Sequence, residues 1–337
     1  MKKTYYLFNP GRLSRKDNTL KFVPVDEEGT EDAASAPKYI PIESVSDLYC
    51  FGSLDANSAL YNFLGKSGVA VHYFDYYENY TGSFFPKDYL LAGKMQLAQT
   101  QHYLDRKKRL VIARKFVQGA AFNMTKTLRY YLNREKDVSP QLDAIAQLYE
   151  QIETTAAIDE LMGIEGNIRQ NYYQAFDIIV NDYEMEGRSR QPPGNELNAL
   201  ISFGNMLCYT LCLNQIYHTQ LNPTISFLHE PGYRRFSLAL DIAELFKPIL
   251  VDRTIFKLLN KKELQPHDFD RQLNSCLLKE SGRKIFVRSW EERIGETFKH
   301  PVLNRSVTYK HLIKLECYKL SKHLLGVDEY KPYKARW

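Results

Sequence analysis

The feature that most constrains this fold is a change in the spacing of apolar residues near residue 86. Before it, short runs rich in Val, Ile, Tyr and Phe predict strands, at residues 4–8, 20–25, 39–41, 46–51 and 69–74. After it, apolar residues recur with the helical period, first over residues 89–133 and then towards the C-terminus. We therefore expect an α+β chain, with an N-terminal β-rich domain at residues 1–86 and a larger all-α domain at residues 87–337.

Local signals add detail to this division. Residues 57–65 have the pattern of a short helix, with Asp55 or Asn57 as its cap. Residues 26–36 are acidic, small and of low complexity, which is typical of an exposed loop. In the second domain we expect helices and loops, apart from a hairpin near residues 284–290.

Composition excludes several classes of protein. Hydrophobic residues make up 44% of the 337, which is too many for a disordered chain, and the net charge is only +5. Five cysteines without a CxxC motif argue against a disulfide framework and for a reducing compartment. The N-terminus lacks the apolar region of a signal peptide, and we find no run of about 18 apolar residues. We expect a soluble, cytoplasmic protein.

The most informative stretch is residues 228–253, LHEPGYRRFSLALDIAELFKPILVDR. A helical pattern starts at Phe236, and Asp241 and Glu244 lie three residues apart on one face of it. Acids on an otherwise apolar helix are costly unless they are paired, hydrogen-bonded or bound to metal. We interpret them as ligands of a divalent metal, with His229 as a third, and the alternative is a surface face with two solvated acids. Pro248 predicts a kink or an early helix end beside them.

A further acid, Glu165, lies between Gly163 and Gly166 at the expected start of a helix. There it is either an N-terminal cap acid, which the helix dipole favours, or a hard oxygen ligand for Mg²⁺ or Mn²⁺. Both interpretations stay open on the spacing alone.

Basic residues cluster at 106–109 and again at Arg234 and Arg235. A charge run is usually a solvated helix face. Arg234 and Arg235 differ because they flank the predicted metal site, where cations suit an anionic substrate such as a phosphodiester.

Taken together, these motifs resemble one known family. GxEG followed by N and YY, Leu-His before a turn, SLALDIxExFKP and VDR resemble the CRISPR-associated endonuclease and integrase that captures new spacers. The runs DLYCFG and GVAVHYFD fit its β-domain, so the resemblance covers nearly the whole chain.

The resemblance implies a metal-dependent DNA endonuclease and integrase, which inserts spacers into a CRISPR array by 3′-hydroxyl attack on phosphodiester bonds. It assigns catalysis to Glu165, His229, Asp241 and Glu244, and Mg²⁺ or Mn²⁺ binding to Glu165, His229 and Glu244, with Asp241 as an accessory acid. Some members have aspartate at the position of Glu244, so which helix acid holds the metal stays open. The family often has arginine where this chain has Lys247.

It also implies partners. We expect a sequence-independent grip on double-stranded DNA by Arg234, Arg235, Lys247 and Arg253. We expect a homodimer formed through the β-domain and a small ferredoxin-like partner that bridges two dimers into a heterohexamer, with no membrane. The competing hypotheses are a catalytically silent DNA-binding scaffold of the same fold and a metal hydrolase acting on small phosphoesters; metal-dependent DNA cleavage separates them.

Overall fold

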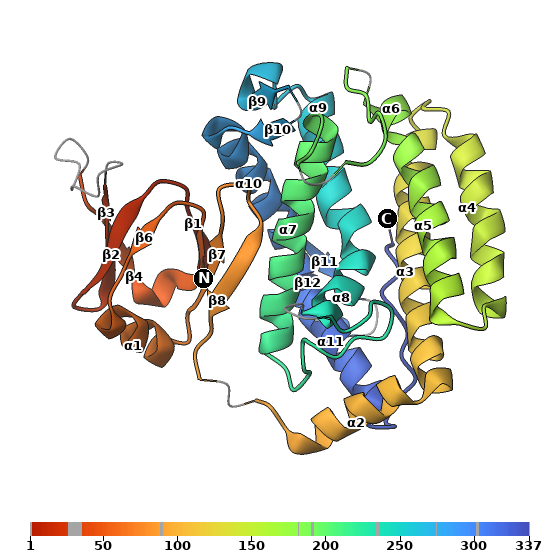
Figure 1. The fold of residues 1–337 in the computed structure, drawn as a ribbon, viewed down its shortest axis with the longest axis horizontal. Helices are drawn as coiled ribbons and strands as arrows, with labels where there is room; N and C mark the ends of the chain where they lie inside the picture. Colours follow the sequence, from red (N-terminus) through yellow and green to blue (C-terminus); the bar gives the residue numbers. More distant parts are fainter. Residues whose placement is uncertain are drawn as a thin grey trace. The chain divides into compact units, whose positions relative to one another are not determined.

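The computed structural model describes residues 2–25, 36–87, 90–180, 182–189, 192–232, 236–273, 275–300 and 303–336. The chain divides into two compact units, Met1–Tyr89 and Leu90–Trp337, each with its own packing (Figure 1). The predicted acidic loop at residues 26–36 falls almost entirely outside the described residues. The chain has the α+β class expected from its apolar periodicity.

The first unit is built on two four-stranded sheets. One has the order β1-β5-β7-β8, formed by Lys3–Leu7, Val45–Cys50, Ala70–Phe74 and Tyr80–Phe84. Its first three strands run parallel and β8 pairs antiparallel with β7. The other has the order β4-β3-β2-β6, formed by Lys38–Pro41, Thr19–Pro24, Gly11–Lys16 and Leu54–Asp55. Periodicity predicted five of these eight strands; it missed the two-residue β6 and also β2, whose polar sequence hides its buried Leu13.

One helix completes this unit. Helix α1, Ser58–Ser67, starts at Asn57, whose Oδ1 accepts the N–H of Leu60 at 3.0 Å, as the cap signal predicted. It ends at Gly68, where φ is +70°, a conformation that only glycine adopts readily. A short 3₁₀ turn, Ile42–Ser44, precedes β5. Leu60 and Leu64 pack with Leu48 and Val71 in the core between the sheets and the helix.

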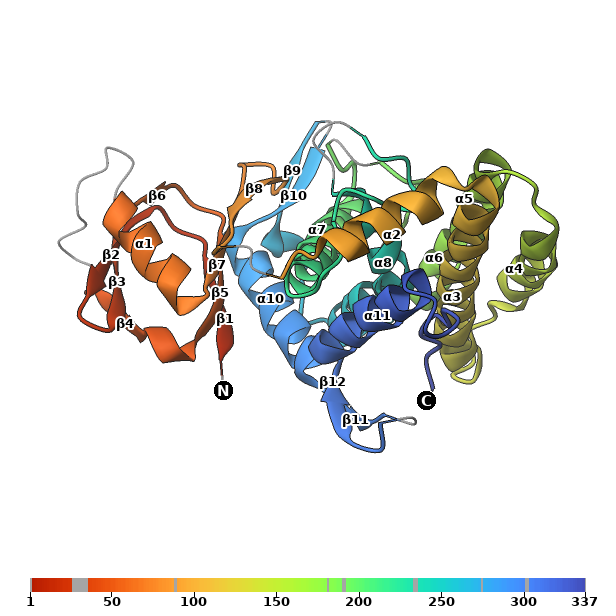
Figure 2. The same ribbon diagram turned by 90° about the horizontal axis from the view of Figure 1, so that it is seen from below.

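The second unit opens with four helices: α2 Gly93–Leu104, α3 Arg106–Leu132, α4 Ser139–Gln151 and α5 Ile158–Gln174. Helices α3, α4 and α5 pack on one another, and both views show α4 at their outer edge (Figures 1 and 2). A 3₁₀ turn, Ile152–Thr154, joins α4 to α5, and the short α6, Phe176–Ile179, follows α5.

The middle of this unit is α7, Glu196–Tyr217, which packs on α8, Ser237–Lys247, and on α11, Tyr309–Leu324. Among the described residues, α7 alone is long and apolar enough to cross a membrane. Because 78% of its apolar window is buried inside the protein, its hydrophobicity is that of a core helix.

After α8 come a π-helical turn, Pro248–Asp252, and α9, Arg253–Asn260. A 3₁₀ turn, Pro266–Asp268, and a hairpin of β9, Phe269–Gln272, and β10, Ser275–Leu278, lead to α10, Glu280–Gly295. A second hairpin, β11 Thr297–Lys299 with β12 Ser306–Thr308, precedes α11. The larger unit is therefore helical but not strictly all-α. The hairpin expected at residues 284–290 is wrong, because those residues lie inside α10, with Phe286 and Trp290 one helical turn apart in the core.

Close contacts fix α8 against α3 and the C-terminal segment. A Cβ added at Gly119 on α3 would lie 2.5 Å from Leu245 Cδ2, so glycine permits this close approach. Asn123 Nδ2 donates to the carbonyl of Leu245 at 2.8 Å, and its Oδ1 accepts the N–H of Ala335 at 2.8 Å. These buried bonds hold the helix that carries both acids of the predicted site.

Candidate active site

The two helix acids are buried. Helix α8 begins directly after Phe236, as predicted, and Asp241 and Glu244 are 0% and 5% exposed. These exposures exclude the alternative of a solvated surface face. The α-helix ends at Lys247, and the π-helical turn begins at Pro248, which has no N–H to donate to the carbonyl of Glu244. The predicted early helix end is confirmed.

Asp241 is the fixed point of the loop that precedes α8. Its Oδ2 accepts the backbone N–H groups of Phe227 and Leu228 at 2.7 and 3.0 Å. Its Oδ1 accepts the N–H of His229 at 3.0 Å and lies 2.8 Å from His229 Nδ1. Four bonds on one buried carboxylate leave Asp241 engaged within the protein, in contacts that position His229.

His229 is consequently held in one orientation. With Nδ1–H donated to Asp241, the neutral imidazole keeps its lone pair on Nε2, which is the atom a metal would bind. Burial disfavours the charged ring, but the hydrogen bond to Asp241 and the charges of Asp241 and Glu244 raise the pKa of His229 above 6.5.

A second set of contacts braces the histidine loop. Arg109 Nε donates to the carbonyl of Phe227 at 2.9 Å, and its Nη2 pairs with Glu230 at 2.6 Å. Ser226 Oγ donates to the carbonyl of His229 at 2.5 Å and bonds to Ser237 Oγ, at the start of α8, at 2.8 Å. Arg109 belongs to the basic run at residues 106–109, for which we expect a solvated face, but its side chain is only 12% exposed and holds the loop.

Glu165 lies in the middle of α5, seven residues after its first residue. The predicted helix start at this position is therefore wrong: the helix continues through Gly163 and Gly166, neither of which has a positive φ. The cap interpretation fails with it, because a mid-helix carboxylate has no free N–H groups to accept from.

Arg169 joins the two candidate carboxylates. Its guanidinium donates to Glu165, with Nε 2.9 Å from Oε1, and an Nη also pairs with Glu244 on α8. Lys247 Nζ lies 2.6 Å from the other oxygen of Glu244. Although burial opposes ionisation, the charges of Arg169 and Lys247 lower the pKa of Glu244 to about 2.

The donor set fits a divalent metal. One neutral imidazole and two carboxylates are a mixed N/O set suited to Mg²⁺ or Mn²⁺. Among the residues that the structure describes, no three His, Cys, Asp or Glu side chains form a ready-made metal cluster. The guanidinium of Arg169 pairs with both Glu165 and Glu244, so these two carboxylates already stabilise a positive charge between them.

The four cations predicted to contact DNA do not form one group in the described structure. Arg234 and Arg235 lie outside the described residues. Lys247 lies at the site, where it pairs with Glu244. Arg253, on α9, lies over the ring of Tyr130, with its Cζ 4.8 Å from the ring centre. Sequence reasoning missed Arg169, although its spacing of four from Glu165 on a helix indicates such a pair. It also missed Asp252, which is 3% exposed and whose pKa burial raises to about 7.

Known proteins are similar in sequence to this chain over most or all of its length. The family model of CRISPR associated protein Cas1 matches residues 5–292. The chain is 44% identical over 338 residues to a CRISPR-associated endonuclease Cas1 of Fusobacterium nucleatum, covering 100% of this chain and 98% of that protein. It is 45% identical over 339 residues to one of Thermodesulfovibrio yellowstonii, covering 100% of both.

Solved structures agree. A CAS1 protein from Thermotoga maritima matches with a TM-score of 0.86 and 38% identity, covering 98% of this chain and 99% of that one. A casposase bound to integration product shares the fold, with a TM-score of 0.88 at 20% identity over 100% of this chain and 95% of the other. With the family model spanning most of the chain and full-length relatives at 44–45% identity, this chain belongs to the CRISPR-associated Cas1 family, as its motifs predicted.

Proposed function

We propose that this chain is a metal-dependent DNA endonuclease and integrase subunit that inserts new spacers into a CRISPR array. Family membership and the endonuclease relatives support the activity. The observation that carries it is the imidazole of His229, oriented by Asp241 on the helix that also carries Glu244, with Arg169 joining Glu244 to Glu165. Nothing in this arrangement favours the silent scaffold, since each acid and the histidine are in place.

Glu165, His229 through Nε2, and Glu244 would hold the metal, Mg²⁺ or Mn²⁺. When bound, it supplies Lewis-acid activation of the nucleophile and stabilises charge on the phosphate in the transition state. Asp241 keeps the proton on Nδ1 of His229 and thereby keeps Nε2 available. Lys247 and Arg169 bring positive charge to the same carboxylates, where it can neutralise phosphate oxygens during water or 3′-hydroxyl attack.

The partners follow from the same family. We propose a homodimer formed by the first unit, a small ferredoxin-like partner that completes a heterohexamer, and double-stranded DNA held through its backbone. A chain of a Cas6-RT-Cas1–Cas2 complex shares this fold, with a TM-score of 0.82 at 17% identity. The proposed location is the cytoplasm.

Strand transfer and cleavage by purified variants test the function. Glu165→Gln, His229→Asn and Glu244→Gln should each lower metal-dependent activity by more than the roughly 10–100-fold that outer partners of a metal ligand typically cost. Asp159→Asn, an exposed acid on the same helix as Glu165, is the matched control and should retain activity.

The rival functions give different results in this assay. A silent scaffold binds DNA but cleaves nothing at any metal concentration. A small-phosphoester hydrolase turns over bis(p-nitrophenyl) phosphate but not DNA. Near-normal strand transfer in all three site variants would refute the proposed active site.

A further inference from the structure

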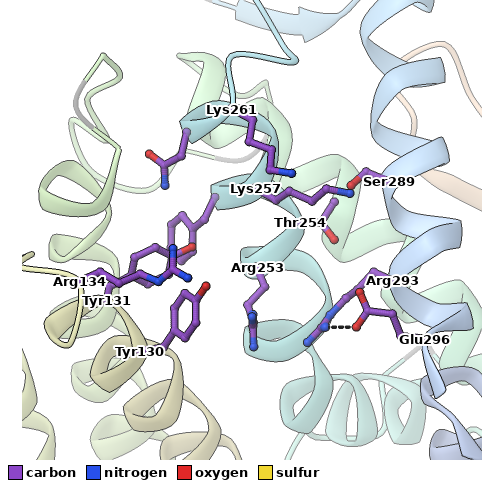
Figure 3. A pocket seen from close by; sticks show the side chains of 12 residues that line it. Tyr130, Tyr131, Arg134, Arg253, Thr254, Lys257, Lys261, Ser289, Arg293 and Glu296 are labelled. Atoms are coloured by element: carbon purple, nitrogen blue, oxygen red, sulfur yellow. Dashed lines mark hydrogen bonds and ion pairs between the residues drawn. The ribbon is translucent and has the colours of Figure 1, made fainter. Parts of the chain in front are cut away.

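A cationic cavity of about 250 Å³ lies between α3, α9 and α10, away from the residues assigned to catalysis (Figure 3). It is smaller than the roughly 300–1,000 Å³ of most drug-sized ligand sites, which favours a small group over a large organic ligand. One carboxylate, Glu296, and five cations are among the described residues that line it. The cations are Arg134, Arg253, Lys257, Lys261 and Arg293.

Among the described residues that line this cavity, cations outnumber acids. Arg293 pairs with Glu296, and Lys257 Nζ lies 2.8 Å from Glu292 Oε2 on the adjacent turn of α10. Burial and the charge of Arg293 lower the pKa of Arg253, so the two guanidiniums disfavour each other's charge. An anion placed between them would relieve that repulsion.

The guanidiniums are also held in place. Arg134 and Arg253 lie over the ring of Tyr130, at 4.5 and 4.8 Å from its centre, and Arg293 lies over Tyr309 at 4.5 Å. Arg293 Nε donates to the carbonyl of Ile249 at 2.9 Å. Figure 3 shows Arg253 and Arg293 reaching into the same space from α9 and α10. Fixed, planar guanidiniums match phosphate oxygens better than mobile lysines do.

The cavity lies a short way along the chain from the active site. Arg253 follows Glu244 by nine residues of continuous helical and π-helical backbone. At roughly 1.5 Å per residue this is about 14 Å. Since successive phosphates on one strand of a duplex advance about 3.4 Å along the helix axis, and lie further apart than that through space, the cavity is within a few nucleotides of Glu244.

We propose that this cavity binds one backbone phosphate of the DNA strand whose phosphodiester or 3′ end is held at the active site. The inference rests on the proposed function, because it takes DNA as the ligand. The cavity acts as a positioning site: it fixes the register of the strand without reading its bases.

Binding of a fluorescein-labelled single-stranded oligonucleotide, followed by anisotropy in EDTA, tests the cavity without requiring catalysis. The double variant Arg134→Gln/Lys261→Gln removes two exposed cations that line the cavity. It should bind about tenfold more weakly at 0.1 M salt, and its log–log salt slope should be smaller by about 0.7, the value for one phosphate contact on a single strand. Lys284→Gln, an exposed cation on α10 that does not line the cavity, is the matched control and should behave as wild type.

Single methylphosphonate substitutions along the same oligonucleotide then locate the phosphate. One position should cost wild type about tenfold in affinity and cost the double variant nothing. If every position affects both proteins equally, the cavity does not hold a strand phosphate. If inorganic phosphate at constant ionic strength displaces the oligonucleotide from wild type alone while no methylphosphonate has an effect, the cavity takes free phosphate and the proposal is wrong. If wild type shows the one sensitive position in this binding scan but cleaves no DNA when metal is supplied, the cavity proposal holds and the proposed function is wrong.

Discussion

At the scale of single residues, two acids three positions apart on one helix have different roles. Asp241 accepts four hydrogen bonds from the histidine loop, whereas Glu244 faces two cations, Arg169 and Lys247. A carboxylate saturated by backbone N–H groups orients its neighbours, and one held only by side-chain cations can exchange them for a metal. This difference answers the question that the motif left open: Glu244, and not Asp241, is the proposed metal ligand.

We predict that metal affinity falls as pH falls through a value above 6.5, because the raised pKa of His229 makes protons compete with the metal. The histidine is protonated below its folded pKa and free to bind metal above it. Isothermal titration with Mn²⁺ from pH 5.5 to 8.5 measures this. Asp241→Asn, which removes the charge that raises the pKa, should move the midpoint lower. An unchanged midpoint in that variant would show that Asp241 does not set the pKa.

We predict that Arg169→Gln destabilises the metal-free protein and tightens Mn²⁺ binding. Breaking a buried ion pair typically costs about 3–5 kcal/mol, and the variant no longer has a guanidinium that the metal must displace. Because the pKa of Glu244 is lowered, this stabilisation is fully present above pH 4.5 and is lost as pH falls through about 2. Melting temperature at pH 7 in EDTA, and then with Mn²⁺, gives both effects.

Lys247→Gln is the matched comparison for Arg169. Lys247 pairs with Glu244 alone, so its removal should lower the melting temperature less and leave Glu165 paired with Arg169. Equal destabilisation by the two substitutions would mean that the bridge between α5 and α8 contributes nothing beyond one ion pair.

At the scale of elements, the loop that carries His229 is held by side chains of two helices, α3 and α8. The loop before α8 has no regular structure of its own around His229, and its geometry comes from Asp241, Ser237 and Arg109. Each belongs to a helix that packs elsewhere in the unit, so the position of the imidazole is set by helix packing. A loop held in this way can be rigid without forming a helix or strand.

We predict that Asp241→Ala destabilises the protein and that Asp241→Asn destabilises it less, because its one carbonyl oxygen can still accept two of the four donors while its NH2 group faces the other two. The alanine variant leaves three backbone N–H groups without their acceptor, each costing about 1–3 kcal/mol when buried. Strand transfer should fall about 10–100-fold in Asp241→Ala, less than in His229→Asn. Urea unfolding and single-turnover assays report the two effects, and a wild-type unfolding midpoint in Asp241→Ala would show that the loop does not depend on this carboxylate.

At the scale of the whole molecule, the first unit presents aromatic residues to solvent. Tyr76 and Tyr77, between β7 and β8, are 75% and 62% exposed, and Tyr39 on β4 is 49% exposed. Exposed tyrosines are frequent in protein interfaces because they combine a large apolar ring with a polar tip. This surface suits the dimer that we propose for the unit.

We predict a homodimer in solution, with twice the 39.3 kDa of one chain by light scattering at micromolar concentration. Tyr76→Ser/Tyr77→Ser should shift the protein towards the monomer, because it removes apolar area from the interface. Tyr318→Ser, a 42% exposed tyrosine on α11 of the other unit, is the control and should leave the mass unchanged. A monomer mass for wild type would refute the dimer.

The sequence by itself determined the features that depend on local spacing. Alternating and helical periods located five strands, the start of α8 directly after Phe236 and its end before Pro248, because backbone sterics, capping and a missing N–H act over a few residues. The side chains with site chemistry were also evident, since acids on an apolar helix need an explanation wherever that helix packs. Family motifs identified the class of protein.

Only the tertiary structure decided which contacts, and therefore which roles, those side chains have. Backbone N–H groups 12 to 14 residues upstream bind Asp241 and give it a different role from Glu244. Arg169, which pairs with Glu165 on its own helix, also pairs with Glu244, 75 residues further along the chain. Glu165 proved to be mid-helix, because packing of α5 on α3 and α4 outweighs the helix-weakening effect of Gly163 and Gly166. The cationic cavity likewise unites residues from α3, α9 and α10, whose proximity no local pattern encodes. Such long-range juxtapositions arise from burial of apolar faces, and that burial sets the positions of polar groups that the periodicity alone cannot pair.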